Sequence, residues 1–238
     1  MYRNTRLVRM IVCDMAGTTV NEGGLVYEAL DNTFKAQGLF VTDEVKKTWH
    51  GVEKREVIAN TVIDNYNRSP RGLCNLVKLS EELFMTQLDK LYFGKDSTVS
   101  LIHPELLDFF SYMRANKIRV TLNTGYPHSF QKKLITYLKL YDHIDDFVSS
   151  DVVARGRPTA HMIHRLMSNA NITDPTTVVK IGDTVSDIKE GRNANCGLVV
   201  GVLSGADNKK DLALEKPDLL LNNIVDLKHH MRKDHVVY

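Results

Sequence analysis

Two acidic motifs far apart in the chain contain the residues best suited to chemistry. Asp14 ends an apolar run and opens the string Asp-Met-Ala-Gly-Thr-Thr, where a strand gives way to a flexible turn. A carboxylate in that position can attack an electrophile while the N–H groups of the turn face an anion. Downstream, Asp183 and Asp187 lie in a turn and in the first turn of an expected helix. Together the three carboxylates suit a hard divalent cation, which indicates phosphoryl chemistry.

Small and polar residues beside these acids are candidates for binding a phosphate. Gly17 and Thr18 belong to the first turn, and the string Asn123-Thr124-Gly125 closes another apolar run. The threonine hydroxyl and the N–H groups of such turns can donate to phosphate oxygens. Helix capping is the ordinary role of a lone threonine or aspartate there, so the interpretation depends on all of these residues occurring together.

The elements that position these residues alternate between strands and helices. Short apolar runs are separated by helix-length amphipathic segments, which predicts a doubly wound, Rossmann-like α/β fold with a parallel sheet. The expected strands are residues 7–13, 118–122, 146–148, 177–181, 198–202 and 219–221. Ligands bind at the carboxyl ends of the strands in such sheets. Asp14, Thr124 and Asp183 each follow an expected strand, so we expect them at one edge of the sheet.

Residues 22 to 98 interrupt this alternation with helical patterns only. Apolar residues recur at three- and four-residue spacing in residues 26–37, 43–49, 54–66 and 76–91. We therefore expect residues 1–21 and 99–238 to form the α/β domain, and residues 22–98 to form an inserted helical domain. Gly23-Gly24 and residues 94–97 are the expected hinges.

Composition narrows the class of protein. Lys and Arg total 31 against 29 Asp and Glu, so a net charge of +2 gives no indication of binding to nucleic acid or to a membrane surface. No apolar stretch approaches the roughly 18 residues of a membrane span. The three cysteines, Cys13, Cys74 and Cys196, lack metal-ligand spacing. We expect a globular protein of the reducing cytoplasm.

In order along the chain, four motifs resemble those of the haloacid dehalogenase superfamily, and within it the phosphonatase (phosphonoacetaldehyde hydrolase)-like branch. They are residues 14–18, 123–126, 156–158 and 182–194. The resemblance implies an inserted cap that closes over a small substrate, with Asp14 as a nucleophile that forms an aspartyl-phosphate. It also implies Mg²⁺ held by Asp14, the carbonyl of Ala16, Asp183 and Asp187.

The expected phosphate-binding cation lies in the string Arg155-Gly156-Arg157-Pro158. A guanidinium there stays charged and can hold two phosphoryl oxygens at once. Spacing alone leaves Arg155 and Arg157 as alternatives. The Gly-Arg-Pro resemblance selects Arg157 as the catalytic cation.

Lys54 is the sharpest functional prediction. Phosphonatases carry Gly-x-x-Lys in the cap, and this chain has Gly51-Val52-Glu53-Lys54, which implies a Schiff base between Lys54 and a substrate aldehyde. Most superfamily phosphatases have a second aspartate where Ala16 stands here. An iminium electron sink makes such an acid unnecessary. An exposed lysine on a helix is the ordinary alternative.

The aldehyde end of the motif departs from the family pattern. Val57 replaces a histidine, Gly24 aligns with a cysteine, and His50 replaces a methionine. His50 could supply the missing imidazole, although a histidine beside Trp49 is more often structural. The substrate is therefore less well defined than the phosphorus end of the site.

Three functional hypotheses remain. The first is a Mg²⁺-dependent hydrolase that cleaves a small phosphonate such as phosphonoacetaldehyde. The second is a small-molecule phosphomonoesterase of the phosphoglycolate phosphatase kind, against which Ala16 counts. The third is an inactive phosphate-binding or regulatory protein, against which the full set of motif residues counts. By analogy, a homodimer through the cap is expected, with Trp49 and the apolar face of residues 26–34 available for it.

Overall fold

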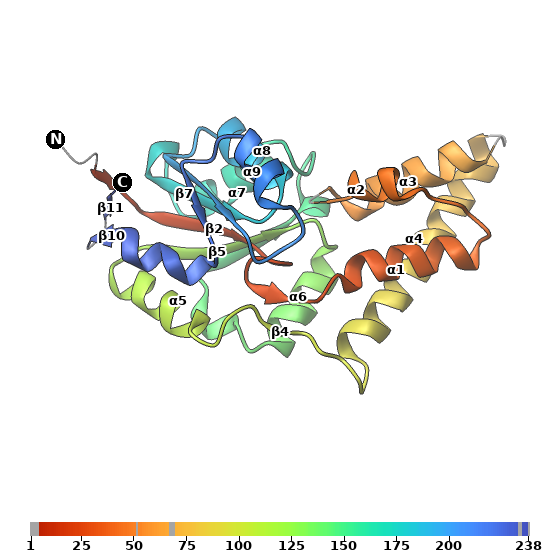
Figure 1. Cartoon of the computed structure of the whole chain (residues 1–238), viewed down its shortest axis with the longest axis horizontal. Helices are drawn as coiled ribbons and strands as arrows, with labels where there is room; N and C mark the ends of the chain where they lie inside the picture. Colours follow the sequence, from red (N-terminus) through yellow and green to blue (C-terminus); the bar gives the residue numbers. More distant parts are fainter. Residues whose placement is uncertain (1–4, 51, 67–69, 233–234, 238) are drawn as a thin grey trace. The chain divides into compact units, whose positions relative to one another are not determined.

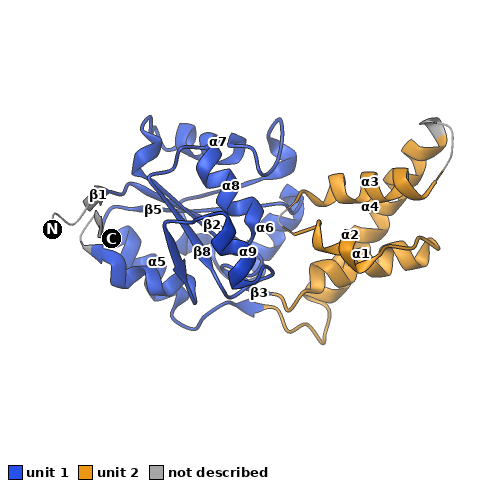
Figure 2. Cartoon of the chain, turned by 45° about the horizontal axis from the view of Figure 1, so that its top comes forward, with its two compact units in different colours: residues 1–21, 100–238 blue, residues 22–99 orange. Residues whose placement is uncertain are grey.

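The chain forms two compact units in a computed structural model that describes residues 5–50, 52–66, 70–232 and 235–237. The α/β unit comprises residues 1–21 and 100–238, and the helical unit comprises residues 22–99 (Figure 2). Gly51, the first residue of the Gly-x-x-Lys motif, lies outside the described residues.

A parallel sheet of six strands forms the centre of the α/β unit. In spatial order its strands are β6 (Asp146–Ser149), β5 (Arg119–Thr124), β2 (Met10–Asp14), β7 (Val178–Gly182), β8 (Leu198–Val202) and β9 (Leu219–Leu221). β2, β7 and β8 are buried at every position, as expected for parallel strands covered on both faces. The predicted α/β class is therefore confirmed.

Helices cover both faces of this sheet (Figure 1). One face carries α5 (Leu106–Ala115) and α6 (His128–Tyr137), and the other carries α7 (His161–Asn169), α8 (Val185–Asn193) and α9 (Lys209–Leu214). Chain connections run outward from β2 through β5 to β6, and then return to β7 on the other side of β2. The carboxyl ends of β2 and β7 consequently form a topological switch point, where doubly wound sheets bind ligands.

The predicted first strand, residues 7–13, was wrong at its start. Leu7 belongs to a separate strand, β1 (Thr5–Leu7), which pairs antiparallel with β11 (His235–Val237). β10 (Met231–Arg232) completes that small sheet, and β3 (Val20–Asn21) pairs with β4 (Ser100–Leu101). Single-turn and short 3₁₀ helices are η1 (Tyr141–His143), η2 (Ser150–Val152), η3 (Pro175–Thr177) and η4 (Ile224–His230).

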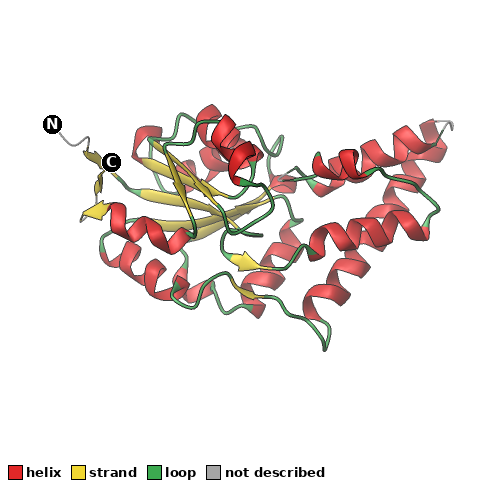
Figure 3. Cartoon of the chain, in the orientation of Figure 1, coloured by secondary structure: helices red, strands yellow, loops and turns green. Residues whose placement is uncertain are grey.

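The described part of the helical unit contains helices joined by loops (Figure 3). They are α1 (Leu25–Ala36), α2 (Asp43–Lys47), α3 (Lys54–Asn65) and α4 (Pro70–Phe93). α2 ends two residues before the predicted boundary, and α4 starts six residues before its predicted start. Proline is favourable in the first turn of a helix, which accounts for the early start of α4 at Pro70.

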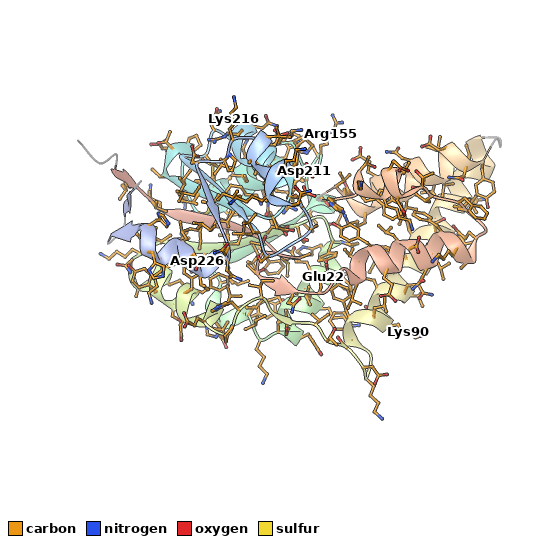
Figure 4. All side chains as sticks on the ribbon, viewed as in Figure 1. Glu22, Lys90, Arg155, Asp211, Lys216 and Asp226 are labelled. Atoms are coloured by element: carbon orange, nitrogen blue, oxygen red, sulfur yellow. The ribbon has the colours of Figure 1, made fainter. Side chains whose placement is uncertain are left out.

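Glu22 links the start of α1 to the end of α4 within the helical unit (Figure 4). Its carboxylate accepts hydrogen bonds from the backbone N–H groups of Gly24 at 3.1 Å and Val26 at 2.9 Å. The hydroxyl of Tyr92 donates to the same carboxylate at 2.7 Å. A side-chain acceptor thus satisfies the N–H groups at the start of α1, where Gly24 has a positive φ.

The residues expected at a cap dimer interface are buried inside the helical unit instead. Trp49 is 2% exposed and packs its ring 5.5 Å from that of Phe34, while Val26 is 1% exposed. These side chains form the unit's own core, so they are not available to a second copy. The homodimer stays a prediction that would require other residues.

None of the described helices is both long enough and apolar enough to cross a membrane. α4 is the longest described helix, with 24 residues, and charged residues recur along it.

Candidate active site

Three carboxylates meet at the carboxyl ends of β2 and β7. Asp14 is the last residue of β2, Asp183 directly follows β7, and Asp187 lies in the first turn of α8. Because β2 and β7 pair in parallel, their carboxyl ends lie side by side. One oxygen from each acid lies within 4.8 Å of the others, and all three acids are buried. This triad can hold a metal ion.

Asp187 combines helix capping with an oxygen turned toward the triad. Its Oδ2 accepts from the Thr184 hydroxyl at 2.6 Å and from the Thr184 N–H at 3.2 Å, forming a capping box at the start of α8. Oδ1 lies 2.9 Å from Lys180 Nζ and 3.2 Å from Arg157 Nε. Neither approach has hydrogen-bond geometry, although both are ion pairs. Oδ1 therefore keeps an acceptor site that suits a cation.

The loop after β8 and the turn after β2 hold Asp183 from two sides. Thr18 donates its hydroxyl to Oδ1 at 2.9 Å, and the N–H of Ala206 donates to Oδ2 at 2.8 Å. Gly17 packs against the same carboxylate, so a Cβ at this position would lie 2.5 Å from Oδ2. Ser204 donates its hydroxyl to the Gly17 carbonyl at 2.7 Å, which joins the two loops.

Arg157 is the cation that forms an ion pair with Asp14. Its Nη2 lies 2.6 Å from Asp14 Oδ1, and its side chain is 3% exposed. Nε forms ion pairs with Asp187 at 3.2 Å and Glu190 at 3.1 Å. Arg155, the alternative by spacing, lies exposed on the α/β unit (Figure 4). Only Arg157 of the two contacts the triad.

Burial and mutual repulsion alter the proton affinities of the acids. Burial raises the pKa of Asp14 to about 6, even though Arg157 opposes the shift. Burial, followed by repulsion from Asp14 and Asp187, raises the pKa of Asp183 well above its ordinary value. Burial also acts to raise the pKa of Asp187, but Arg157 and Lys180 more than compensate and lower it. The protein alone therefore does not stabilise all three charges.

A buried network that the sequence analysis did not identify adjoins the triad. Lys180 in β7 and Glu190 in α8 are both 0% exposed and lie 3.1 Å apart. Asn123 contacts both, with Lys180 donating to its Oδ1 at 2.8 Å and its Nδ2 donating to Glu190 at 2.9 Å. The available signal was a lysine between valine and isoleucine in an apolar strand, because a charge at a buried position requires partners.

The predicted phosphate-binding residues fall into two groups. Gly17 and Thr18 already donate their N–H groups within the turn, to Val20 at 2.8 Å and Met15 at 3.2 Å. Phosphate binding through them stays a prediction that would require the turn to rearrange.

The second group follows β5. The side chain of Asn123 is turned into the buried network, so it has protein partners at both its oxygen and its nitrogen. Thr124 ends β5 at 3% exposure and accepts from the Tyr126 N–H at 3.2 Å, and Gly125 is half-buried beside it. Phosphate binding through Thr124 and Gly125 stays a prediction.

Lys54 is a buried lysine at the start of α3 in the helical unit. It is 5% exposed, and Nζ donates to the carbonyls of Trp49 at 2.9 Å and Val52 at 2.8 Å. The ammonium also lies 5.3 Å from the ring centroid of Tyr27, whose ring is 4.9 Å from that of His50. An aromatic face and two carbonyl oxygens both favour a cation at this position.

Comparisons with known proteins identify relatives along most of the chain. Residues 8–195 match the family model of haloacid dehalogenase-like hydrolases. A phosphonoacetaldehyde hydrolase from Latilactobacillus sakei is 32% identical over 213 residues, covering 84% of this chain and 77% of the relative. A phosphoglycolate phosphatase from Nitrosococcus oceani is 24% identical over 221 residues, covering 92% of this chain and 95% of the relative.

Solved structures show the same fold. A phosphonoacetaldehyde hydrolase-like protein from Oleispira antarctica superposes with a TM-score of 0.77 at 21% identity, covering 94% of this chain and 91% of the other. Enzymes of this family generally use a divalent metal, and the buried acidic triad can bind one. Since the family model spans both acidic motifs and the switch point between them, the chain belongs to the haloacid dehalogenase-like hydrolases.

Proposed function

We propose that this hydrolase cleaves the carbon–phosphorus bond of a small phosphonate with a neighbouring aldehyde, phosphonoacetaldehyde being the simplest. The proposal is supported by the combination of Ala16 and Lys54. Ala16 leaves no carboxylic acid two residues after Asp14, while Lys54 is a buried amine at the start of a helix. A lysine that forms an iminium removes the need for the missing acid.

The chemistry of the bond explains why these two features belong together. A carbon leaving phosphorus carries away an electron pair and needs a place for it. The Lys54 amine condenses with the aldehyde and loses water, and the resulting iminium accepts the pair as an enamine. Protonation and hydrolysis of the enamine then release acetaldehyde and return the lysine. Every atom of the phosphonate is accounted for without an acid at position 16.

Asp14 is assigned to the phosphorus end of the reaction. One of its oxygens attacks phosphorus and forms an aspartyl-phosphate, which water hydrolyses to phosphate and the free carboxylate. Arg157, 2.6 Å from Asp14, supplies the charge that lets an anionic nucleophile approach an anionic substrate. Thr124 and Gly125 are assigned to binding the phosphoryl oxygens.

Mg²⁺ is the proposed metal, with Asp14, Asp183, Asp187 and the carbonyl of Ala16 as ligands. The residues fit, because hard oxygen donors suit Mg²⁺ and Asp187 Oδ1 is a buried oxygen without an aligned hydrogen-bond donor. Among the residues that the structure describes, none donates a hydrogen bond to the Ala16 carbonyl. When bound, the ion would neutralise charge on the acids and on the phosphoryl oxygens.

His50 is proposed to contact the aldehyde end of the substrate. Its ring stacks at a tilt on Tyr27, 4.9 Å away, and the same tyrosine lies against the Lys54 ammonium. An imidazole near the lysine can accept and return the proton that carbinolamine formation and dehydration require. This role would replace the histidine that Val57 displaces.

A phosphomonoesterase of the phosphoglycolate phosphatase kind is the second candidate. The specific observation in its favour is that Lys54 Nζ donates to two backbone carbonyls, an arrangement that suits a permanent cation gripping an anionic substrate. The similarity to the Nitrosococcus oceani phosphatase also supports it. A protein that only binds phosphate is disfavoured, because the acid triad and Arg157, 2.6 Å from Asp14, supply the residue types that phosphoryl transfer requires.

Borohydride trapping separates the two enzymes. Incubation with phosphonoacetaldehyde and borohydride should inactivate the protein and leave a reduced two-carbon adduct on the Lys54 peptide, measured by mass spectrometry. Lys54→Arg keeps the charge but forms no iminium, so it should lose hydrolysis of phosphonoacetaldehyde and remain unlabelled. A panel of phosphate monoesters assayed in parallel measures the alternative activity.

Lys46→Arg is the matched control, because Lys46 is another lysine of the helical unit and forms an ion pair with Asp31 at 2.7 Å. It should retain activity and label normally. A Lys54→Arg variant that still hydrolyses phosphonoacetaldehyde, or a wild type without an adduct, would reject the Schiff base. Turnover of a phosphate monoester in that case would establish the second candidate.

A further inference from the structure

A buried ion network adjoins the acid triad without touching the atoms proposed to react. Asn123, Lys180 and Glu190 are each 0% exposed. Lys180 Nζ donates to Asn123 Oδ1 at 2.8 Å and lies 2.9 Å from Asp187 Oδ1 and 3.1 Å from Glu190 Oε2. The ammonium therefore has one hydrogen-bond acceptor, Asn123 Oδ1, and two ion-pair partners, Asp187 and Glu190.

Glu190 connects this lysine to the arginine of the site. Its carboxylate accepts from Asn123 Nδ2 at 2.9 Å and from Arg157 Nε at 3.1 Å. Arg157 Nη2 donates to the side-chain oxygen of Asn123 at 2.8 Å and to its backbone carbonyl at 3.1 Å. The network consequently fixes the Nε and Nη2 edge of the guanidinium, while Lys180 fixes Asp187.

The charges of this region match a divalent cation. Four buried carboxylates (Asp14, Asp183, Asp187 and Glu190) and two buried cations (Arg157 and Lys180) carry a formal charge of −2 when all are ionised. Without Lys180 the formal charge would be −3. Buried ions are expensive to desolvate, and a well-packed apolar residue is often at least as stable in their place. A lysine in the centre of an apolar strand therefore calls for a role beyond stability.

We propose that Lys180 is a positioning residue of the active site, which acts with Glu190 and Asn123 to hold Arg157 and Asp187 against Asp14. The inference rests on the proposed function, because these positions matter only if Arg157 binds the phosphoryl group and Asp187 binds the metal. Asn123 acquires a positioning role through the same contacts. Lys180 is assigned no direct contact with the substrate or the metal.

Three variants test this role: Lys180→Met, Glu190→Gln and the double variant. We would measure thermal unfolding, Mn²⁺ binding by calorimetry, inorganic phosphate binding, and kcat and KM on whichever substrate the wild type hydrolyses. Lys180→Met leaves a buried carboxylate without its cation and should lower the unfolding temperature. The double variant keeps the charges balanced and should largely restore that temperature. In Lys180→Met and in the double variant, kcat should fall. The Kd for Mn²⁺ should rise by about tenfold or more, as it does when residues that orient metal ligands are replaced. Glu190→Gln should mainly raise KM.

Lys189→Met is the matched control. Lys189 is the same residue type in the same helix as Glu190, but its side chain is 49% exposed and it pairs with Glu215 at 3.3 Å. It should bind Mn²⁺ and turn over substrate as the wild type does.

Several outcomes would overturn the inference. If Lys180 acted only through its charge, it would repel the metal, and Lys180→Met would bind Mn²⁺ more tightly than the wild type. If Lys180 only stabilised the fold, kcat would recover together with the unfolding temperature in the double variant. If Lys180→Met does not fold, the double variant and Glu190→Gln decide the question. If the wild type hydrolyses neither phosphonoacetaldehyde nor phosphate monoesters, the proposed function fails, while Mn²⁺ and phosphate binding still decide the role of Lys180.

Discussion

As the proposed nucleophile, Asp14 must satisfy two demands that oppose each other. A nucleophile should be ionised, yet this side chain is 5% exposed at the end of a buried strand, and burial raises its pKa to about 6. Arg157 at 2.6 Å works against that shift. The raised pKa makes the carboxylate more basic, and therefore a better nucleophile once ionised, than an aspartate in water. A metal cation near Asp14 would add to Arg157 and Lys180 in favouring the ionised form.

Replacement of Asp14 by asparagine should abolish turnover and preserve the fold. Asparagine has nearly the same shape, but its amide does not attack phosphorus. We expect a loss of kcat far beyond tenfold, and a loss within about tenfold, which is about 1.4 kcal/mol in the barrier, would contradict the assignment. The measurement is a product assay with circular dichroism as the check on folding. Asp108→Asn, at an exposed position on α5, is the control.

At the scale of elements, the site depends on two loops that meet at Asp183. The turn after β2 supplies Gly17 and Thr18, and the loop after β8 supplies Ser204 and the N–H of Ala206. Both loops follow strands of one parallel sheet, so their distance is set by strand pairing through β7. A side chain larger than a hydrogen atom at the point where these two loops meet would push them apart.

Gly17→Ala tests this contact. Gly17 has φ +78°, and an added Cβ would lie 2.5 Å from Asp183 Oδ2 and 2.7 Å from the Cα of Gly205. We expect a loss of stability of about 1 kcal/mol from the backbone strain alone, and in addition weaker Mn²⁺ binding by calorimetry. Gly38→Ala is matched in strain, with φ +69°, but its Cβ would meet nothing within 4 Å. It should lose stability without losing Mn²⁺ affinity, and equal metal affinities in the two variants would contradict the prediction.

The sequence predicted strand ends better than it predicted contacts. The strands expected to end at residues 13, 122 and 181 end at Asp14, Thr124 and Gly182, within two residues, and the parallel topology brings Asp14 and Asp183 together. The direction of the Asn123 amide was not predictable, because its partners Lys180 and Glu190 are 57 and 67 residues away. Pairings of that range depend on helix placement rather than on local pattern.

Short strands such as β1 were not predicted, for a different reason. β1 has three residues and pairs with a strand at the other end of the chain. Three residues are too few for an alternating pattern to be distinguished from a loop. Its stability comes from backbone pairing with β11, which the local sequence does not encode.

For the whole molecule, the buried acids couple metal binding to pH and to stability. The pKa of Asp14 rises from 3.8 to about 6 on folding, and burial raises that of Asp183 as well. A group with a raised pKa in the folded state stabilises the fold below its unfolded pKa, and this contribution is lost as the pH rises through the folded pKa. The metal-free protein should therefore lose the stability contributed by Asp14 between pH 3.8 and about 6, and the raised pKa of Asp183 acts in the same direction.

Mg²⁺ should supply the missing stabilisation where the acids are ionised. At about pH 7.5 Asp14 is ionised and the ion displaces no proton from it, whereas at about pH 5 the ion must displace the proton of Asp14. The increase in unfolding temperature should therefore be larger at the higher pH. Differential scanning fluorimetry with saturating Mg²⁺ against chelator, at both pH values, measures the two increments. Asp183→Asn removes a proposed ligand and should abolish both. Equal increments, or a larger one at the lower pH, would mean that the ion binds elsewhere than among these buried acids.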